Sequence, residues 1–301
     1  MKDTLPDGEI LLGNGAIGRG LVEAGVHVVA SYPGTPSSEI VPEVVRFVKM
    51  HELNTHVEWS TNEKVAFDNA YAASLTGKRA AVVMKQVGLN VAADSLMSAA
   101  YTGIVGGMVI ISCDDPGPHS SQTEQDSRLF AHFAKVPVFD PSSPEEARRM
   151  ILDAFILSED ARIPVLVRPA IRVCHARQFI AYEEPLRLDR PAKFVKDPTR
   201  WAATPRYRYQ LHKELHATFA RIAGEHEAWH KYDHYNLEGG KQYPLGVIAG
   251  GVPYATVVDT LASAGLSETV PVMKMGLPYP FPRRLANEFL AQVDCALVLE
   301  E

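Results

Sequence analysis

Short apolar runs alternate with longer amphipathic stretches along the first half of the chain. Four runs are almost entirely apolar, as is typical of strands in a parallel sheet covered on both faces: residues 26–31, 80–84, 107–112 and 164–169. Between them apolar residues recur with helical spacing, at about 12–24, 36–50, 63–76, 91–103, 124–134 and 144–158. Because strands alternate with helices, the pattern predicts an α/β domain whose parallel sheet has helices on both faces.

The pattern changes after residue 176. Residues 176–242 are rich in Arg, His, Tyr and Lys, with little apolar periodicity outside 205–230, which indicates a long connection carrying one polar helix. From residue 244 onward the order strand, helix, strand, helix, strand returns. We therefore predict three parts: a first domain over 8–178, a linker over 179–242, and a smaller β-α-β-α-β domain over 243–301. The last predicted strand stops at the end of the chain, so we expect a piece of a longer polypeptide or a subunit of a split one.

Composition narrows the class of protein. The chain has 301 residues, 46% of them hydrophobic and 22% charged, as in a soluble globular protein of two domains. A net charge of -6 argues against nucleic-acid binding, and no apolar run has the length of a membrane span. The N-terminus does not resemble a secretory signal, and Cys113, Cys174 and Cys295 form no C-x-x-C pair. These features indicate a cytoplasmic protein, without an Fe–S or zinc motif in this chain, whose cysteines are small buried hydrophobic residues.

Two segments bring candidate chemistry to one edge of the predicted sheet. Glu63 follows a short strand and begins a helix rich in small residues, where a carboxylate would be partly buried and would need a dedicated partner. Residues 85–90, Lys-Gln-Val-Gly-Leu-Asn, follow the next strand as a turn. Since the carboxyl ends of parallel strands share one edge, we expect Glu63 to lie beside this turn and to suit a nitrogen heterocycle. The alternative for the second segment is a plain β–α turn, with Gly88 for backbone freedom and Asn90 as a cap, and Glu58 is expected to be structural.

Two further loops belong to the same edge. The turn over residues 31–39 places the hydroxyls of Thr35 and Ser37 at a helix start, where they could hold a small anion or simply cap the helix. The long polar loop over residues 113–128 contains His119, a possible proton carrier or a solvated histidine. Its acidic residues lack a recognisable metal spacing.

A glycine motif near the N-terminus has two explanations. Residues 13–18 match G-x-G-x-x-G, the fingerprint of dinucleotide-binding domains. The strand before it is short, and the second strand ends in Ser31 rather than in an acidic residue. A helix start that packs closely on its neighbours is therefore favoured over a nicotinamide-dependent dehydrogenase.

Four motifs in order resemble one known family: SYPGTPSSEI, VEWSTNEKVAFDNAYAAS, VMKQVGLNVAADSLM and DDPGPHSSQTEQDSRLFAHFAKVPVFDPS. They are similar to the N-terminal half of the α subunit of indolepyruvate:ferredoxin oxidoreductase, a branch of the thiamine-diphosphate-dependent 2-oxoacid:ferredoxin oxidoreductases. The resemblance is strong over residues 8–175 and weaker to the end. It implies a pyrimidine-binding domain at 8–178 and a transketolase C-terminal-like domain at 243–301.

The resemblance also implies roles for particular residues. Glu63 matches the glutamate that contacts N1′ of the aminopyrimidine and is the implied catalytic residue. The implied cofactor contacts around it are Gln86, Gly88, Leu89 and Asn90. The implied substrate contacts are Thr35, Ser37, His119, Ser120 and Gln122. The implied reaction is oxidative decarboxylation of an arylpyruvate to its acyl-CoA, with electrons passed to ferredoxin.

The chain departs from the family pattern in what it lacks. It contains neither the Gly-Asp-Gly motif that holds diphosphate and Mg²⁺ nor the two cysteine clusters that hold Fe–S centres. The resemblance therefore implies thiamine diphosphate shared with a diphosphate-binding and Fe–S-containing domain or subunit, a γ-type or β subunit, CoA as co-substrate, and an oligomer. The alternative is a non-catalytic split or truncated relative that acts as a binding or assembly module.

Overall fold

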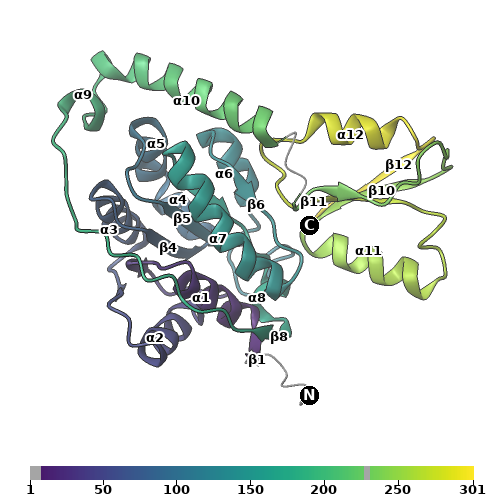
Figure 1. The fold of residues 1–301 in the computed structure, drawn as a ribbon, viewed down its shortest axis with the longest axis horizontal. Coiled ribbons are helices and arrows are strands. Elements are labelled where there is room, and N and C mark those ends of the chain that lie inside the picture. Colours follow the sequence, from purple (N-terminus) through teal and green to yellow (C-terminus); the bar gives the residue numbers. More distant parts are fainter. Residues whose placement is uncertain (1–7, 227–230) are drawn as a thin grey trace.

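The computed structural model describes residues 8–226 and 231–301, and its larger part is built on a six-stranded parallel sheet (Figure 1). The strand order is β3-β2-β4-β5-β7-β6. The strands are β2 Val28–Ser31, β3 His56–Trp59, β4 Ala80–Lys85, β5 Met108–Cys113, β6 Val138–Phe139 and β7 Val165–Val167. The four predicted apolar runs form β2, β4, β5 and β7; the two-residue β6 was not predicted.

Helices cover both faces of this sheet. Helices α1 Gly13–Glu23, α2 Ile40–Met50 and α7 Pro144–Ala161 form one hydrophobic core with the sheet; α3 Glu63–Leu75, α5 Ala93–Thr102 and α10 Pro205–His226 form the other. Neighbouring residues of β4 face opposite sides, so Val83 belongs to the first core and Val82 to the second. The predicted parallel sheet with helices on both faces is confirmed.

Three shorter helices follow strands: α4 Gln86–Val91 directly after β4, α6 Ser127–Ala134 after a long loop from β5, and α8 Ile171–His175 shortly after β7. The segment expected to be a turn after β4 is therefore helical, and the helix expected over 91–103 is present as α5. A separate antiparallel pair, β1 Gly8–Leu12 with β8 Arg177–Ala181, lies outside the parallel sheet. The predicted domain boundary at residue 178 falls within β8.

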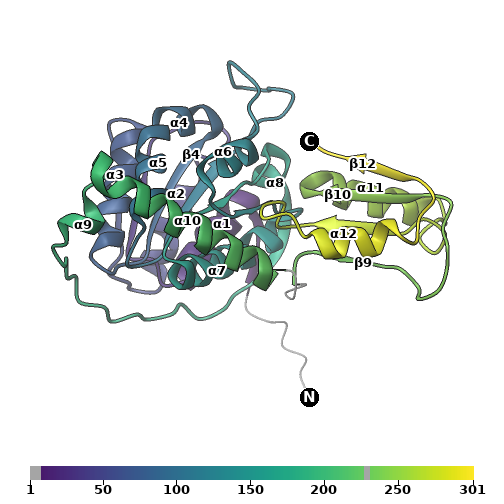
Figure 2. The same ribbon diagram turned by 90° about the horizontal axis from the view of Figure 1, so that it is seen from above.

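The connection after β8 runs along the outside of the larger domain before the chain turns back as a helix (Figures 1 and 2). It contains α9 Pro198–Trp201 and the 22-residue α10, where one helix was expected. Although α10 is mostly polar, it buries Leu211, Leu215 and Ile222 and packs on α5. The boundaries of the linker remain a prediction.

The C-terminal part is a smaller layered unit. Its elements are β10 Gly246–Gly250, α11 Gly251–Ser263, β11 Val272–Met275, α12 Arg283–Leu290 and β12 Ala296–Leu299. The three strands are parallel in the order β12-β10-β11, with α11 and α12 on opposite sides (Figure 1). The predicted β-α-β-α-β unit is confirmed; a short antiparallel strand, β9 His234–Tyr235, joins its edge and was not predicted.

The smaller unit closes the β6 edge of the larger sheet. The backbone N–H of Val138 donates to the carbonyl of Tyr279 at 2.9 Å, and the N–H of Asp140 donates to Gly276 at 2.8 Å. A partly buried ion pair between Lys274 of β11 and Glu146 of α7 adds a charged contact. The edge strand is therefore paired rather than exposed.

Candidate functional site

Glu63 is the first residue of α3 and lies at the carboxyl edge of the sheet. The N–H of Ser60 donates to the carbonyl of Ser31 at 2.8 Å, which fixes this segment beside the end of β2. Asn62 caps the helix, since its side-chain oxygen accepts from the N–H of Val65 at 2.9 Å. Glu63 is half-buried, and no hydrogen bond or ion pair joins its carboxylate to another of the described residues. A partly buried carboxylate at a helix N-terminus is thus available for a ligand.

Gly88 in α4 lies directly against the Glu63 side chain. A Cβ atom at Gly88 would be 2.6 Å from Cγ and 2.7 Å from Oε1 of Glu63. Carbon atoms in contact ordinarily stand about 3.5–4.0 Å apart, so only glycine leaves room for the glutamate. The expected juxtaposition of these two segments is present, and close approach rather than a turn explains the glycine.

The residues around Gly88 differ in their surroundings. Gln86 is buried; its Nε2 lies 3.4 Å from the carbonyl of Thr123, and its Oε1 has no partner within the described part of the chain. Leu89 is fully buried in the hydrophobic core. Asn90 is exposed and donates to Gln125 at 2.7 Å, so its amide engages the β5–α6 loop.

The turn after β2 brings Thr35 to the same edge. Thr35 is exposed, and its carbonyl lies 3.5 Å from the hydroxyl of Ser120 in the β5–α6 loop. Ser37 is fully buried, and its hydroxyl donates to the carbonyl of Gly34 at 2.7 Å. The Thr35 hydroxyl is therefore open to a ligand, whereas that of Ser37 serves the local turn.

Asp115 organises the β5–α6 loop, which projects from the body of the molecule beside α6 (Figure 2). Its carboxylate accepts the backbone N–H groups of His119, Ser120 and Ser121 at 2.9–3.1 Å. Burial raises the pKa of Asp115, but these hydrogen bonds outweigh burial and leave the pKa below its ordinary value. The side chains of His119, Ser120 and Gln122 are exposed on this ordered loop.

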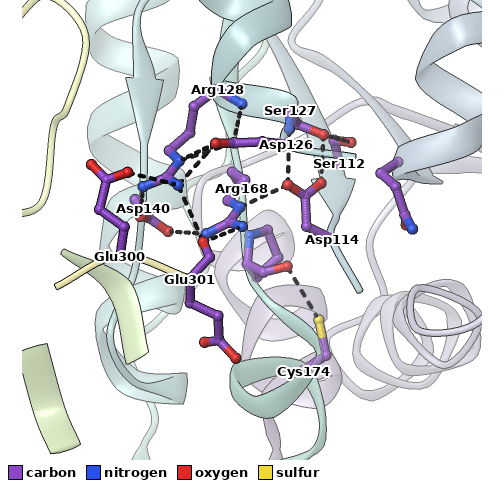
Figure 3. A network of polar contacts seen from close by, with 12 residues as sticks. Ser112, Asp114, Asp126, Ser127, Arg128, Asp140, Arg168, Cys174, Glu300 and Glu301 are labelled. Atoms are coloured by element: carbon purple, nitrogen blue, oxygen red, sulfur yellow. Dashed lines mark hydrogen bonds and ion pairs between the residues drawn. The ribbon is translucent and has the colours of Figure 1, made fainter. Parts of the chain in front are cut away.

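A buried network of aspartates and arginines lies beneath this loop (Figure 3). Arg168, just after β7, donates to Asp114 after β5 at 2.7 Å and lies 3.4 Å from Asp140 after β6. Arg128 of α6 approaches Asp140 at 3.7 Å. Both arginines also donate to the backbone carbonyl of Glu301, at 2.9 and 3.1 Å. The network therefore joins three strand ends of the large sheet to the smaller unit.

Burial dominates the electrostatics of this network. It raises the pKa of Asp114 and of Asp140 above the ordinary range, although Arg168 opposes the effect at both. Sequence reasoning did not single out Arg168, Arg128 or Asp140. A signal was present, because a charged residue directly follows each of three successive apolar strands of a parallel sheet.

Asp140 also touches the smaller unit where α11 begins. A Cβ atom at Gly251 would lie 3.0 and 3.1 Å from the two carboxylate oxygens of Asp140, and Gly251 has φ +50°. At Gly250 a Cβ would meet the carbonyl of Met275 at 2.7 Å. The paired glycines thus permit the carboxylate to approach the helix start.

The G-x-G-x-x-G motif has a packing role. It lies in α1, which is buried along its whole length, and a Cβ at Gly13 would collide with the carbonyl of Val173 at 1.8 Å. A Cβ at Gly18 would lie 3.2 Å from the carbonyl of Ile40 in α2. The strand before the motif is β1, which pairs only with β8 and lies outside the parallel sheet, so the dinucleotide-binding context is absent from these elements.

The three cysteines differ in their exposure to solvent. Cys113 and Cys174 are buried as expected, but Cys295 is exposed, so the expectation for this residue was wrong.

No group of three or more His, Cys, Asp or Glu side chains within residues 8–226 and 231–301 is arranged to hold a metal ion. Among the same residues, no helix combines the length and apolar character needed to cross a bilayer. Five cavities of 350–490 Å³ in the described structure are lined by other residues than Glu63, Gly88 or Thr35.

Comparison with known proteins places this geometry in a family. A family model described as "Pyruvate flavodoxin/ferredoxin oxidoreductase, thiamine diP-bdg" matches residues 19–236. The chain belongs to this family. The matched region includes Glu63, Gly88, Thr35 and the β5–α6 loop.

Curated relatives extend the likeness to almost the whole chain. The indolepyruvate oxidoreductase subunit IorA of Thermococcus kodakarensis is 42% identical over 97% of this chain and 45% of its own length. The corresponding subunit of Methanothermobacter marburgensis is 43% identical over 97% of this chain and 46% of its own length. This chain therefore spans about half the length of the curated relatives that it matches.

A solved structure supports the fold. The 2-oxoglutarate:ferredoxin oxidoreductase from Magnetococcus marinus, with 2-oxoglutarate, coenzyme A and succinyl-CoA bound, superposes with a TM-score of 0.80. The match covers 97% of this chain and 58% of the other, at 18% identity. The likeness shows that this family member has the same arrangement of elements.

The residues at the edge fit the cofactor for which the family is named. Glu63 offers a half-buried carboxylate without a protein partner among the described residues, and Gly88 leaves a space beside it that a Cβ would fill. A protonated or hydrogen-bonded ring nitrogen is a suitable partner for such a carboxylate.

Proposed function

We propose that this chain supplies the pyrimidine side of the thiamine diphosphate site in a 2-oxoacid:ferredoxin oxidoreductase. The observation that carries the proposal is the Glu63 carboxylate, half-buried against Gly88 at the carboxyl edge of the sheet and without a protein partner among the described residues. The exposed side chains of Thr35, His119 and Ser120 at the same edge support a site whose other wall comes from a second domain or subunit.

Glu63 would hold a proton at N1′ of the aminopyrimidine. When bound, the cofactor supplies an electron sink that accepts the electron pair left behind as CO₂ departs from a 2-oxoacid. Partial burial strengthens the interaction of the Glu63 carboxylate with that nitrogen, because less water competes for it. The adjacent Gly88, with Leu89 in the core beneath it, would keep the glutamate in one position; Gln86 and Asn90 complete the proposed cofactor wall.

The substrate would lie between the Thr35 turn and the β5–α6 loop. The Ser120 hydroxyl lies 3.5 Å from the Thr35 carbonyl, which supports a shared role for these two segments. We place Thr35, Ser37, His119, Ser120 and Gln122 on the substrate side. Thr35 and the loop residues offer exposed polar groups, whereas Ser37 would act through the turn it stabilises.

We further propose an arylpyruvate such as indolepyruvate as substrate, with CoA taking up the acyl group and ferredoxin the electrons. The support is that the relatives matched over 97% of this chain carry the name indolepyruvate oxidoreductase subunit. Relatives named 2-oxoglutarate synthase and ketoisovalerate oxidoreductase subunits are only 27% and 26% identical over little more than half of the chain. A partner domain or subunit would supply the Mg²⁺–diphosphate and Fe–S sites in a cytoplasmic, oligomeric complex.

The test is Glu63→Gln in the assembled complex of this chain with the polypeptides that provide those sites. We expect turnover of the 2-oxoacid to fall about 10²- to 10⁴-fold, the usual contribution of a positioned acid–base group. Glu58→Gln is the matched control, because Glu58 bonds only to protein groups such as Asn69 and Ser60. Equal turnover by the Glu63→Gln and wild-type complexes would refute the assignment. A wild-type complex that assembles but never turns over would instead favour a non-catalytic assembly module.

A further inference from the structure

Lys85 lies between the two parts of the proposed site. It is the last residue of β4 and immediately precedes α4, which carries Gly88. Its side chain is half-buried and lies against Gly34, where a Cβ would be 2.8 Å from Cδ and 3.1 Å from Cγ of the lysine. Glycine at position 34 therefore leaves the space that the lysine stem occupies.

The Lys85 ammonium differs from the other cations near this edge. Arg128 and Arg168 are committed to buried aspartates, and Lys64 pairs with Asp94 at 2.7 Å. By contrast, no hydrogen bond or ion pair joins the Lys85 ammonium to another of the described residues. An ammonium without a carboxylate partner, carried on a stem held against Gly34, is suited to an anionic ligand because the protein does not neutralise its charge.

The position of Lys85 links it to both proposed ligand contacts. Gly34, which supports its stem, directly precedes the exposed Thr35. Three residues after Lys85, Gly88 touches Glu63. The ammonium lies two bonds beyond the Cδ that contacts Gly34, and is therefore close to the Thr35 turn.

We propose that Lys85 binds the carboxylate of the 2-oxoacid substrate, with the Thr35 hydroxyl as its second donor. The inference rests on the proposed function and names the residue that selects for the anionic end of the substrate. A hydroxyl gives the carboxylate one hydrogen bond but no opposite charge, whereas an ammonium adds a full positive charge to its hydrogen bond. The site thereby distinguishes a 2-oxoacid from an uncharged ketone or aldehyde of the same shape.

The test is Lys85→Met in the assembled complex, with methionine retaining most of the stem that packs on Gly34. We expect KM for the arylpyruvate to rise about 10- to 100-fold, as for the loss of a hydrogen bond to a charged group. Competitive inhibition by an arylpropionate should weaken equally, while inhibition by the matching neutral methyl ketone should not change. Lys85→Arg should recover part of the loss. Lys49→Met is the control, because Lys49 is exposed in the last turn of α2 at the other end of the sheet.

Three outcomes would overturn the inference. The first is an unchanged KM for the arylpyruvate, and the second is a change confined to the thiamine diphosphate concentration required for activity. The third is weaker assembly of the complex, with an unchanged KM in the complex that still forms. The second would assign the ammonium to the cofactor phosphates, and the third to a partner carboxylate. Failure of the proposed function would look different, since the wild-type complex would not turn over arylpyruvates or Glu63→Gln would remain active.

Discussion

The contact between Gly88 and Glu63 allows the proposed site to be tested without removing any functional group. In Gly88→Ala the new methyl group would stand 2.6 Å from Cγ, 2.7 Å from Oε1 and 2.9 Å from Cδ of Glu63. Ordinary carbon contacts are about 3.5–4.0 Å, so the glutamate or α4 must move by about 1 Å. The glutamate side chain is the more flexible of the two, so we expect its carboxylate to leave its position.

The magnitude follows from that displacement. Misplacing a catalytic group by about 1 Å costs on the order of 10²-fold in rate, so kcat of the assembled complex should fall by about that factor. Stability should change less. Overpacking costs about 1–3 kcal/mol and replacing a helical glycine by alanine returns about 0.5–1 kcal/mol, so the net loss should be about 0–2.5 kcal/mol.

The assay pairs kcat of the assembled complex with chemical denaturation of the chain. Gly224→Ala is the matched control, because Gly224 lies in α10 with nothing within 4 Å of its added Cβ. It should stabilise the chain by about 0.5–1 kcal/mol and leave kcat unchanged. A Gly88→Ala complex with wild-type kcat would refute the argument that this glycine exists to position Glu63.

Two further changes test the charged groups. Arg168→Met removes the cation that donates to Asp114 and leaves Asp140 with Arg128 alone, so it should destabilise the chain by about 3–5 kcal/mol in urea denaturation. Arg221→Met, at an exposed ion pair, should change the stability by less than about 1 kcal/mol, and equal effects of the two changes would contradict the network's importance. Burial raises the pKa of Glu159, but hydrogen bonds from Arg79 and Arg190 outweigh it and hold the pKa at about 2 against an ordinary 4.5. Because the folded-state pKa is depressed, the stability this carboxylate contributes is present above pH 4.5 and is lost as pH falls toward 2. The stability advantage of wild type over Glu159→Gln should therefore shrink across that window, and an advantage that stays constant would disprove the reasoning.

Apolar periodicity predicted the architecture wherever an element was long enough to carry a pattern. The runs that became β4 and β5 begin with five and four consecutive apolar residues, all buried, and they could be assigned without a structure. Strands β6 and β9 have two residues each, too few to show any period. Tertiary pairing, with β7 in one case and β11 in the other, creates these strands.

The site was predictable in part. Glu63 and Gly88 could be placed together because both follow strands that end at the same edge of a parallel sheet. The helical state of α4 could not be predicted, because a glycine such as Gly88 is typical of a turn. The reason for this glycine is instead the side chain of Glu63, 25 residues earlier. The pairing of Arg168 with Asp114 and Asp140 depends on the strand order β5-β7-β6, which no local pattern contains.

The meeting of Asp140 with the start of α11 also constrains how the sequence can diverge. At position 251 a side chain would face both a backbone φ of +50° and the carboxylate oxygens of Asp140. Shortening the residue at 140 would relieve only the second obstacle, and would leave Arg168 with one partner fewer. Substitutions at positions 140, 168 and 251 are therefore coupled, although position 251 lies in the smaller unit and the other two lie in the larger one. In related sequences, a tolerated change at one of these positions should be accompanied by changes at the others.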